Sequence, residues 1–286
     1  MPELPEVEAL VRFLDEKCAG ETISRIEIAA LSALKTYDPP LESLRGRKIE
    51  QVSRRGKYLI LDVPPSFIVI HLARGGWVQW RDPLPPGRAK PGRGPLALRV
   101  GLGNGSGFDV TEQGTEKRLA VWATNSPAGL EGVARLGPDP LDPNFDAATL
   151  GSLLAGHSGN LKTVLTDQSV IAGVGNAYSD EALHAAKMSP YKPAGKLSDA
   201  EVAALYEALV GVLRDAVNRS LGLPASGLKS EKKSGLSVHG RTGQSCPVCG
   251  DTIREVSFSS KSMQYCPTCQ TGGKPLADRR LSRLLK

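Results

Sequence analysis

The sequence lacks any long hydrophobic run, and it does not begin with the basic and apolar segment of a secretion signal. A membrane-spanning helix needs about 20 consecutive apolar residues, and the longest apolar stretches here are only as long as a strand. No internal repeat with a period of about 20–50 residues is visible either. These absences exclude a membrane protein and a solenoid, and they predict a soluble, cytoplasmic chain.

Basic residues exceed acidic ones. The chain has 36 Lys and Arg against 30 Asp and Glu, a formal net charge of +6 and a pI of about 9.1. This excess favours a polyanionic partner without identifying it. A chain of 286 residues can also bury a sizeable core, and we expect two domains or more.

The first half of the chain has the pattern of a β structure. Apolar residues at helical spacing predict one helix over residues 5–18, and extended runs separated by Pro-Pro, Asn-Gly and Gly-Gly breakers follow it. The runs cover residues 22–29, 58–63, 67–72, 77–80, 96–102 and 119–122. We therefore expect residues 1–126 to form an antiparallel β-sandwich or barrel with a leading helix.

The second half has helical periodicity. It follows the Pro- and Asp-rich passage LGPDPLDPNFD, which places a linker over residues 127–146. A helical domain is predicted over residues 147–222, and its last helix opens with a capping box of Ser198 and Glu201. The candidate helices cover residues 147–154, 161–166, 176–186 and 198–218. Residues 223–241 have no period and are expected to form a mobile basic loop, so the fold class is α+β with several domains.

The strongest signal in the residues themselves is a pair of CxxC sequences near the C-terminus. Sixteen residues separate the inner cysteines, which is the spacing of a zinc ribbon. The four predicted zinc ligands are Cys246, Cys249, Cys266 and Cys269. Two disulfides are the alternative, but cytosolic thiols stay reduced. We expect a structural zinc finger over residues 242–271 with a β-hairpin that carries Lys261 near its tip, followed by a basic tail over residues 272–286.

A glycine-rich turn runs into a predicted helix at VIAGVGNAYSDEALHAA. Backbone N–H groups at such a helix start can bind an anion, and Gly175 with Asn176 would lie there. Lys162, just upstream, would supply positive charge. Close helix packing is the alternative reason for the glycines. With a basic chain and a zinc hairpin, the turn points to phosphates of a nucleic acid.

The opening MPELPEVE contains residues that helix formation does not explain. Pro5 and two of the glutamates suit the first turn of a helix, whereas Pro2 and Glu3 have no such function. Methionine before a small residue is normally removed, which would leave the secondary amine of Pro2 as the N-terminus. An α-amine titrates near ~8 and is a nucleophile at neutral pH, and Glu3 could then move protons. A frayed terminus is the alternative.

Several sequences spread along the chain resemble one protein family. They are MPELPEVE, RRGKYL at residues 54–59, HLARGG at 71–76, GVGNAYSDEAL at 173–183, VHGR at 238–241 and the CPxC and YCPxCQ of the finger. Their order is similar to that of the formamidopyrimidine-DNA glycosylase and endonuclease VIII family. The resemblance implies an N-terminal β-sandwich, a helix-two-turn-helix domain and a C-terminal zinc finger.

The family resemblance also implies an activity and a set of partners. The expected protein is a bifunctional DNA glycosylase and AP lyase that excises damaged, chiefly oxidised, bases and cleaves the strand by elimination. It would act as a monomer on damaged DNA in a bacterial-type nucleoid, with one structural Zn²⁺ and no organic cofactor. A weakly active or inactive binder of lesions or unusual DNA that keeps the fold is the alternative. A zinc-ribbon transcription factor would not explain the first 240 residues.

The resemblance assigns roles to individual residues. Pro2 would be the Schiff-base nucleophile, Glu3 its acid/base partner and Lys57 the lysine beside the damaged nucleotide. A solvated lysine at a strand end is the alternative for Lys57. Glu6 would order the active-site helix, and His71 would support the site. Asn176 matches the phosphate-binding asparagine of the helix-two-turn-helix domain.

The chain departs from the family pattern at three of the positions that the resemblance assigns to base extrusion and the finger. Arg74 stands where the family has a methionine that fills the gap left by the extruded base. Arg118 is retained, but Leu119 replaces a phenylalanine, and Lys261 replaces an arginine of the finger. Arg74 either contacts the opposite base or contacts a phosphate. These changes concern base extrusion and lesion choice, which the sequence leaves open.

Overall fold

The computed structural model describes residues 1–90, 92, 94–258 and 261–277. It divides into two compact units. Unit 1 is Met1–Arg135 together with Ser220–Lys229, and unit 2 is Leu136–Arg219 together with the chain from Ser230 onward. The chain therefore leaves unit 1 at Arg135 and returns to it for one short segment. Among the described residues, no helix combines the length and apolar character needed to cross a membrane.

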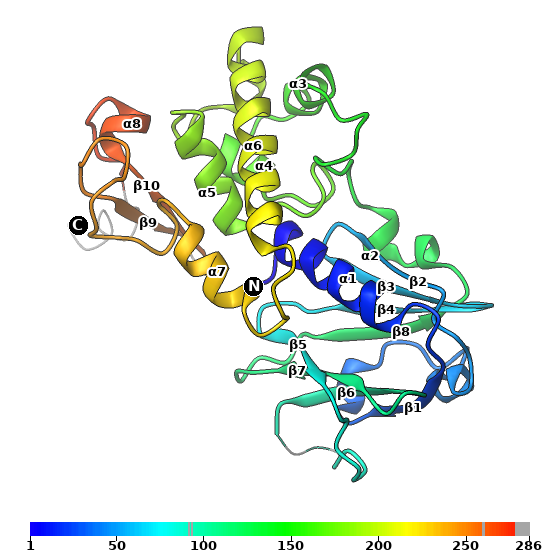
Figure 1. Cartoon of the computed structure of the whole chain (residues 1–286). Coiled ribbons are helices and arrows are strands. Elements are labelled where there is room, and N and C mark those ends of the chain that lie inside the picture. The colour runs from blue at the N-terminus through cyan, green and yellow to red at the C-terminus, as the bar shows by residue number, and fades with distance from the viewer. Residues whose placement is uncertain (91, 93, 259–260, 278–286) are drawn as a thin grey trace. The chain divides into compact units, whose positions relative to one another are not determined.

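Unit 1 contains two four-stranded antiparallel sheets and helix α1 (Leu4–Cys18), which packs against β2 and β3 (Figure 1). One sheet has the order β2-β3-β4-β8 and the other the order β1-β6-β7-β5. The strands are β1 (Ile23–Ile28), β2 (Gln51–Arg55), β3 (Tyr58–Val63), β4 (Ser66–His71), β5 (Gly76–Arg81), β6 (Leu96–Leu102), β7 (Gly107–Glu112) and β8 (Ala120–Thr124). The predicted β-sandwich with a leading helix is confirmed.

The core of unit 1 explains why these elements form. Leu10, Leu14 and Cys18 of α1 are fully buried because they lie on one apolar face of the helix. Cys18 is therefore a core residue. Apolar residues also face each other across the sheet, for example Leu61 opposite Ile68. Short elements complete the unit, namely η1 (Leu31–Ala33), η2 (Leu41–Leu44), η3 (Pro127–Gly129) and α2 (Glu131–Ala134).

The segment of unit 1 that follows unit 2 in the chain is held by one tryptophan. The Nε1 of Trp77 donates to the carbonyl of Ala225 at 2.8 Å, and Nζ of Lys229 lies 4.7 Å from the centre of the Trp77 ring. Leu228 is fully buried in the same core, and Trp77 is only 6% exposed. This returning segment is therefore an integral part of unit 1.

Unit 2 is helical and contains one β-hairpin near its C-terminal end. Its elements are α3 (Ala147–Ala155), α4 (Leu161–Leu165), α5 (Asn176–Ala185), η4 (Ala194–Lys196), α6 (Asp199–Ser220), α7 (Leu228–Gly235), β9 (Arg254–Phe258), β10 (Lys261–Tyr265) and α8 (Pro267–Thr271), although α6 and α7 each reach into the returning segment. The predicted capping box forms, since Ser198 N donates to Glu201 at 3.1 Å and Glu201 N donates to Ser198 Oγ at 3.4 Å. The helical domain and the finger hairpin are confirmed.

The expectation of an irregular loop over residues 223–241 is wrong for its centre, where α7 lies. The composition of α7, LKSEKKSG, offers only one apolar residue, so the sequence shows no helical stripe. Cation–π contacts of two lysines hold the helix where an apolar stripe is missing. Lys229 lies over the Trp77 ring, and Lys232 Nζ lies 4.8 Å from the centre of the Tyr178 ring.

Candidate active site and nucleic-acid interface

The first residues of the chain form a closed hydrogen-bonded cap on α1. Glu3 is the N-cap residue, and its backbone N–H donates to Oε2 of Glu6 at 2.8 Å. The Glu3 carboxylate in turn accepts from the backbone N–H of Glu6, which completes a capping box built from two glutamates. Glu3 and Glu6 are 3% and 1% exposed, and Pro2 is buried beside them. The cap therefore fixes Glu3 next to Pro2.

An ion-pair network continues along α1. Glu8 accepts from Arg54 of β2 at 2.7 Å and from Arg12 at 2.8 Å. Burial opposes ionisation of Glu8, but these two arginines outweigh it and lower the pKa of its carboxyl. The helix that directly follows the candidate nucleophile is thus tied to the edge strand β2 by charge as well as by apolar packing.

Lys57 and His71 are neighbours in the sheet that supports α1. Lys57 lies in the turn between β2 and β3 and is 7% exposed, while His71 ends β4 and faces Tyr58 with the ring centres 4.7 Å apart. Burial and the positive charge of Lys57 lower the pKa of His71 to about 4. At neutral pH the pair offers a cation beside a neutral imidazole, a combination that can hold an anion without two adjacent positive charges.

Two turns meet at one end of β5 and β7 and carry two exposed arginines. We call residues 73–75 and 113–118 the arginine edge. Gln113 N donates to the carbonyl of Gly75 at 3.1 Å, and Gly76 lies opposite Glu112 in the sheet. A Cβ on Gly75 would lie 2.1 Å from the carbonyl oxygen of Gln113, so the close approach of the turns requires glycine there. Arg74 and Arg118 are both exposed on this edge.

Glu112 organises the second turn of the arginine edge. Its Oε1 accepts from the backbone N–H of Arg118 at 2.8 Å and of Leu119 at 2.9 Å. Leu119 is only 2% exposed and belongs to the core of unit 1. The prediction that Leu119 faces the duplex is therefore not supported, because its side chain fills the core in place of presenting a wedge. Glu112 had no signal in the sequence beyond its alternation with apolar residues.

Lys162 pairs with a buried aspartate inside unit 2. Its Nζ donates to Asp180 Oδ1 at 2.5 Å, to Ser179 Oγ at 2.8 Å and to the carbonyl of Asn176 at 2.6 Å. Lys162 is 8% exposed, and Asp180 is fully buried. An ammonium has three N–H donors, and these three contacts match them. Lys162 therefore forms an internal ion pair, while its predicted contact to phosphate stays a prediction.

The turn before α5 is built by a residue that the sequence did not single out. Gln168 accepts from Gly173 N at 3.0 Å and donates to the carbonyl of Val174 at 2.6 Å. Gly173 has φ +86°, which an L side chain rarely adopts. Gly175 is the N-cap of α5 and has no side chain to cap the helix. The predicted glycine turn at a helix start therefore exists, while its binding to phosphate stays a prediction.

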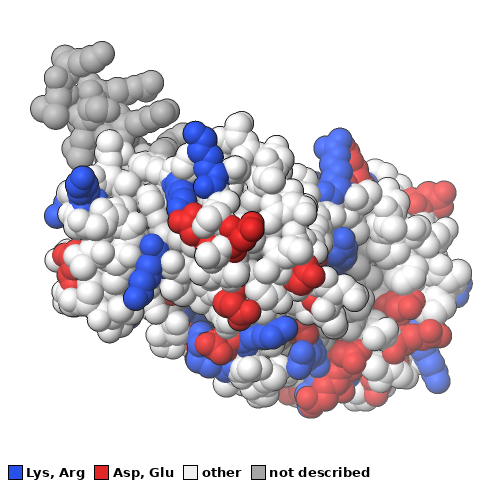
Figure 2. Space-filling model, turned by 90° about the horizontal axis from the view of Figure 1, so that it is seen from above, with Lys and Arg blue, Asp and Glu red and all other residues white. Residues whose placement is uncertain are grey.

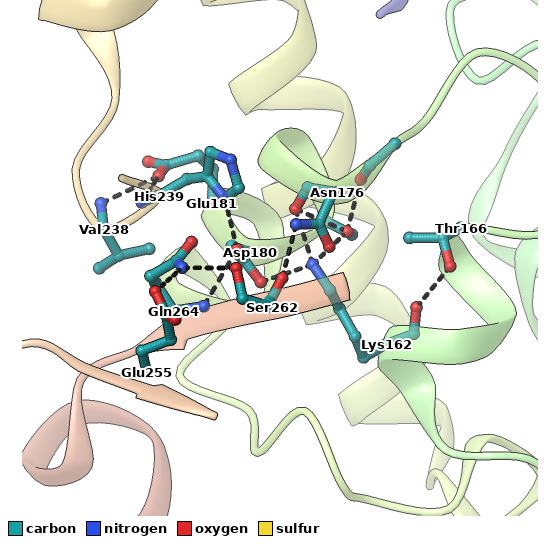
Figure 3. Close-up of polar contacts among 12 residues, drawn as sticks. Lys162, Thr166, Asn176, Asp180, Glu181, Val238, His239, Glu255, Ser262 and Gln264 are labelled. Carbon is teal, nitrogen blue, oxygen red and sulfur yellow. Dashed lines mark hydrogen bonds and ion pairs between the residues drawn. The ribbon is translucent and has the colours of Figure 1, made fainter. Parts of the chain in front are cut away.

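One face of α5 holds the finger and the segment before it (Figure 3). Asn176 Nδ2 donates to the carbonyl of Ser262 in β10 at 2.6 Å. Asp180 accepts from His239 Nδ1 at 2.7 Å and from Gln264 N at 3.2 Å. Glu181 accepts from the backbone N–H groups of residues 237, 238 and 239 at 2.7–2.9 Å. These acids are part of the GVGNAYSDEAL stretch, but their partners lie more than fifty residues further along the chain and have no local signal.

The four predicted zinc ligands converge. Cys249 Sγ lies 3.3 Å from Cys266 Sγ, and Cys246 Sγ lies 3.9 Å from Cys269 Sγ. Such separations suit four thiolates around one ion with Zn–S distances of about 2.3 Å. Burial and the neighbouring sulfurs of Cys249 and Cys246 raise the pKa of Cys266 to about 11, so a cation is needed for all four to ionise. The donor set fits a structural zinc ion.

The remaining predicted basic sites are Lys261 and the basic tail over residues 272–286. Lys261 begins β10, but its side chain lies outside the described part of the chain, as do residues 278–286 of the predicted basic tail. On the face shown in Figure 2, lysine and arginine side chains are mixed with aspartate and glutamate. The net charge of +6 is therefore not gathered into one basic patch on that face.

Three family models match successive parts of the chain. The formamidopyrimidine-DNA glycosylase N-terminal domain matches residues 1–110, and the H2TH domain of the same enzyme matches residues 136–224. The zinc finger found in FPG and IleRS matches residues 243–272. The chain belongs to the formamidopyrimidine-DNA glycosylase family. The helix-two-turn-helix and zinc-finger architecture expected from the sequence is thereby confirmed.

Individual members of the formamidopyrimidine-DNA glycosylase family are similar over most of the chain. The formamidopyrimidine-DNA glycosylase of Symbiobacterium thermophilum is 35% identical, covering 98% of this chain and 93% of that protein. An uncharacterised formamidopyrimidine-DNA glycosylase-like protein of Mycobacterium tuberculosis is 65% identical over 159 residues, covering 56% of this chain and 99% of that protein.

Solved structures of the family are similar to this chain over most of its length. The Lactococcus lactis enzyme, non-covalently bound to DNA containing an AP site, has a TM-score of 0.80 at 26% identity, covering 94% of this chain and 99% of that one. MutM in complex with DNA containing carbocyclic 8-oxo-G has a TM-score of 0.82 at 26% identity, with 94% and 100% coverage.

Proposed function

We propose that this protein excises damaged, chiefly oxidised, bases from DNA and then cleaves the strand, with the amine of Pro2 as nucleophile. One observation carries the proposal. Pro2 is buried directly before a capping box that fixes the carboxylate of Glu3 beside it. A cap on α1 would require no proline at position 2 and no second acid as N-cap, since serine or threonine would serve as well. Family membership and relatives seen on damaged DNA agree with this chemistry.

The reaction follows from a secondary amine beside a carboxyl group. With Met1 removed, the Pro2 nitrogen forms a bond to C1′ of the damaged nucleotide, and the base leaves with the electron pair of its glycosidic bond. The nitrogen then loses its proton, Glu3 gives a proton to the ring oxygen, and the sugar opens to an iminium. Loss of a C2′ proton converts the iminium to an enamine. The electron pair of the enamine then returns and expels the 3′ phosphate with the electrons of its C–O bond. The strand is thereby cut by elimination.

Other residues would hold the DNA backbone. Lys57 and His71 offer a cation and a neutral imidazole next to each other, and the turn at Gly175 and Asn176 offers backbone donors at a helix start. The four cysteines of the finger would hold one Zn²⁺, which contributes folding free energy and leaves the chemistry to Pro2 and Glu3. The base must leave the stack, at a cost of a few kcal/mol that a damaged pair lowers.

Borohydride trapping on DNA with an abasic site or an oxidised base tests this function. The processed protein should form a covalent adduct, Pro2→Gly should form much less, and a protein that retains Met1 should form none. Equal trapping by a protein with a blocked N-terminus would assign the nucleophile to another amine, such as Lys57. Tight DNA binding without any adduct or strand cleavage would instead support the non-catalytic binder.

We further propose that Arg74 contacts the base opposite the lesion. Arg74 is exposed on the arginine edge, which also carries Arg118, and a guanidinium can stack on a base while its edge forms hydrogen bonds. Arg74→Met should then change the ranking of opposite bases in an excision assay. An even loss of affinity for all of them, with a salt slope shallower by about 1, would assign Arg74 to a phosphate.

A further inference from the structure

A histidine of α5 lies against the zinc-ligand cluster. The Nε2 of His184 is 3.3 Å from Sγ of Cys246, and His184 is 5% exposed. The ligand atoms of His184, Cys246, Cys266 and Cys269 all lie within 4.8 Å of one another. His184 is thus the one group outside the two CxxC sequences, among the described residues, that joins this cluster of metal-binding side chains.

The position of His184 continues a regular spacing along α5. Asn176, Asp180 and His184 are four residues apart, and side chains at this spacing lie on one face of a helix. Asn176 contacts Ser262, Asp180 contacts Gln264 N, and His184 contacts Cys246. One helix face therefore follows the finger from its hairpin to its cysteine cluster.

The direction of the His184 contact follows from the chemistry of a metal-bound cysteine. A cysteine that binds Zn²⁺ is a thiolate, which has lone pairs and no hydrogen to donate. A neutral imidazole donates from one ring nitrogen and accepts at the other. Because the sulfur can only accept, Nε2 must carry the hydrogen and donate it.

We propose that His184 is a positioning residue for the zinc site, donating its Nε2–H to the Cys246 thiolate. The hydrogen bond withdraws electron density from the sulfur and orients its lone pairs toward the ion. Partners of metal ligands commonly change metal affinity by about 10–100-fold. Retention of zinc in the finger then depends on α5, the helix whose acids also hold residues 237–239.

Two substitutions separate the hydrogen bond from simple packing. His184→Phe fills a similar volume without a donor, and His184→Gln keeps an N–H donor. The first measurement is the rate at which a chromogenic chelator removes zinc from the full-length protein. The second is the absorption spectrum of the protein loaded with Co²⁺ in place of zinc, in which the thiolate-to-metal band reports the electron density on sulfur.

The expected results are specific to a hydrogen bond. His184→Phe should release zinc about tenfold faster and shift the thiolate-to-cobalt band to longer wavelength. His184→Gln should restore both values at least in part. The control His157→Phe, a like substitution between α3 and α4, should change neither.

Two outcomes would overturn the proposal. Unchanged zinc release and an unchanged cobalt band in His184→Phe would reduce His184 to a packing residue. A wild-type cobalt spectrum typical of three sulfurs and one nitrogen would make His184 a ligand, with Cys249 outside the set. If His184→Phe does not fold, His184→Leu takes its place in both measurements, with faster zinc release and a band at longer wavelength than in His184→Gln expected for a hydrogen bond and equal values expected for packing alone.

Discussion

The arginine edge of unit 1 and the finger-facing side of α5 in unit 2 handle charge in opposite ways. On the arginine edge, the charges are exposed, and backbone hydrogen bonds and a close approach at Gly75 hold the turns. On the finger-facing side of α5, the carboxylate of Asp180 is buried and meets the buried ammonium of Lys162, from α4, at 2.5 Å. The arginine edge can therefore change its side chains without losing its shape, whereas the α5 face cannot.

The difference between these two regions bears on how a basic residue next to a DNA-contacting motif is interpreted. Lys162 and Arg118 both lie beside stretches that resemble the DNA-contacting parts of the family. Only Lys162 has a fully buried carboxylate within reach, and this partner is eighteen residues away in the sequence. A role in DNA binding should therefore be assigned to a lysine only after its possible ion-pair partners inside the fold are known.

The largest expected effect is at Lys162. Lys162→Met should lower the free energy of unfolding by about 3–5 kcal/mol, because it leaves the carboxylate of Asp180 buried without its cation. The exposed Arg118→Met serves as the matched control and should change it by no more than about 0.5 kcal/mol. Urea denaturation measures both. A stable Lys162→Met protein with weakened DNA binding would reverse the assignment and make Lys162 a phosphate contact.

The next effect concerns pH and His71. Its pKa is lowered from 6.5 to about 4, so the unfolded chain takes up more protons as the pH falls through this window, and folding stability is lost there. His71→Gln should remove about 2–3 kcal/mol of that loss between neutral pH and pH 4. Urea denaturation across the window gives the difference between the two proteins.

The same His71 shift can be measured directly. An NMR titration of His71 should give a pKa near 4, and Lys57→Met should raise it, because one of its two causes is then gone. An imidazole that titrates at its ordinary value in the folded protein would contradict both the burial and the neighbouring charge.

A smaller effect tests the shape of the arginine edge. Gly75→Ala should destabilise unit 1 by about 1–3 kcal/mol, because its Cβ would lie 2.1 Å from the carbonyl oxygen of Gln113. Ala73→Gly, two residues away, should have the opposite sign, with a gain of up to about 1 kcal/mol, since Ala73 has φ +50°. Thermal unfolding of both variants is the measurement, and equal losses would show that the turn is not constrained as described.

Local chemistry made much of the fold predictable from the sequence. The capping box of Ser198 and Glu201 was visible because both partners lie within one helical turn. The spacing of Cys246 and Cys249, and of the second pair, specified a four-sulfur site because each CxxC supplies two ligands from one knuckle.

Features that depend on distant partners were not predictable. Strand β7 is buried at all six positions although Asp109 and Thr111 alternate with apolar residues, and Arg99 compensates Asp109 at 2.7 Å, so the polar face that the alternation would place in solvent is buried. Leu119 was expected at the duplex, but only the folded chain shows that it lies in the core. His184 carried a signal that could have been used, namely its spacing of four from Asp180 on a predicted helix.

The returning segment at residues 220–229 limits which fragments of the chain can be expressed as a folded unit 1. Unit 2 up to Arg219 is an insertion between two stretches of unit 1. A fragment encoding residues 1–135 alone would lack Ala225, whose carbonyl accepts from Trp77, and Leu228, which is fully buried in the same core. Expression of the first unit by itself therefore requires a permuted or spliced gene in which residues 220–229 are joined back to it.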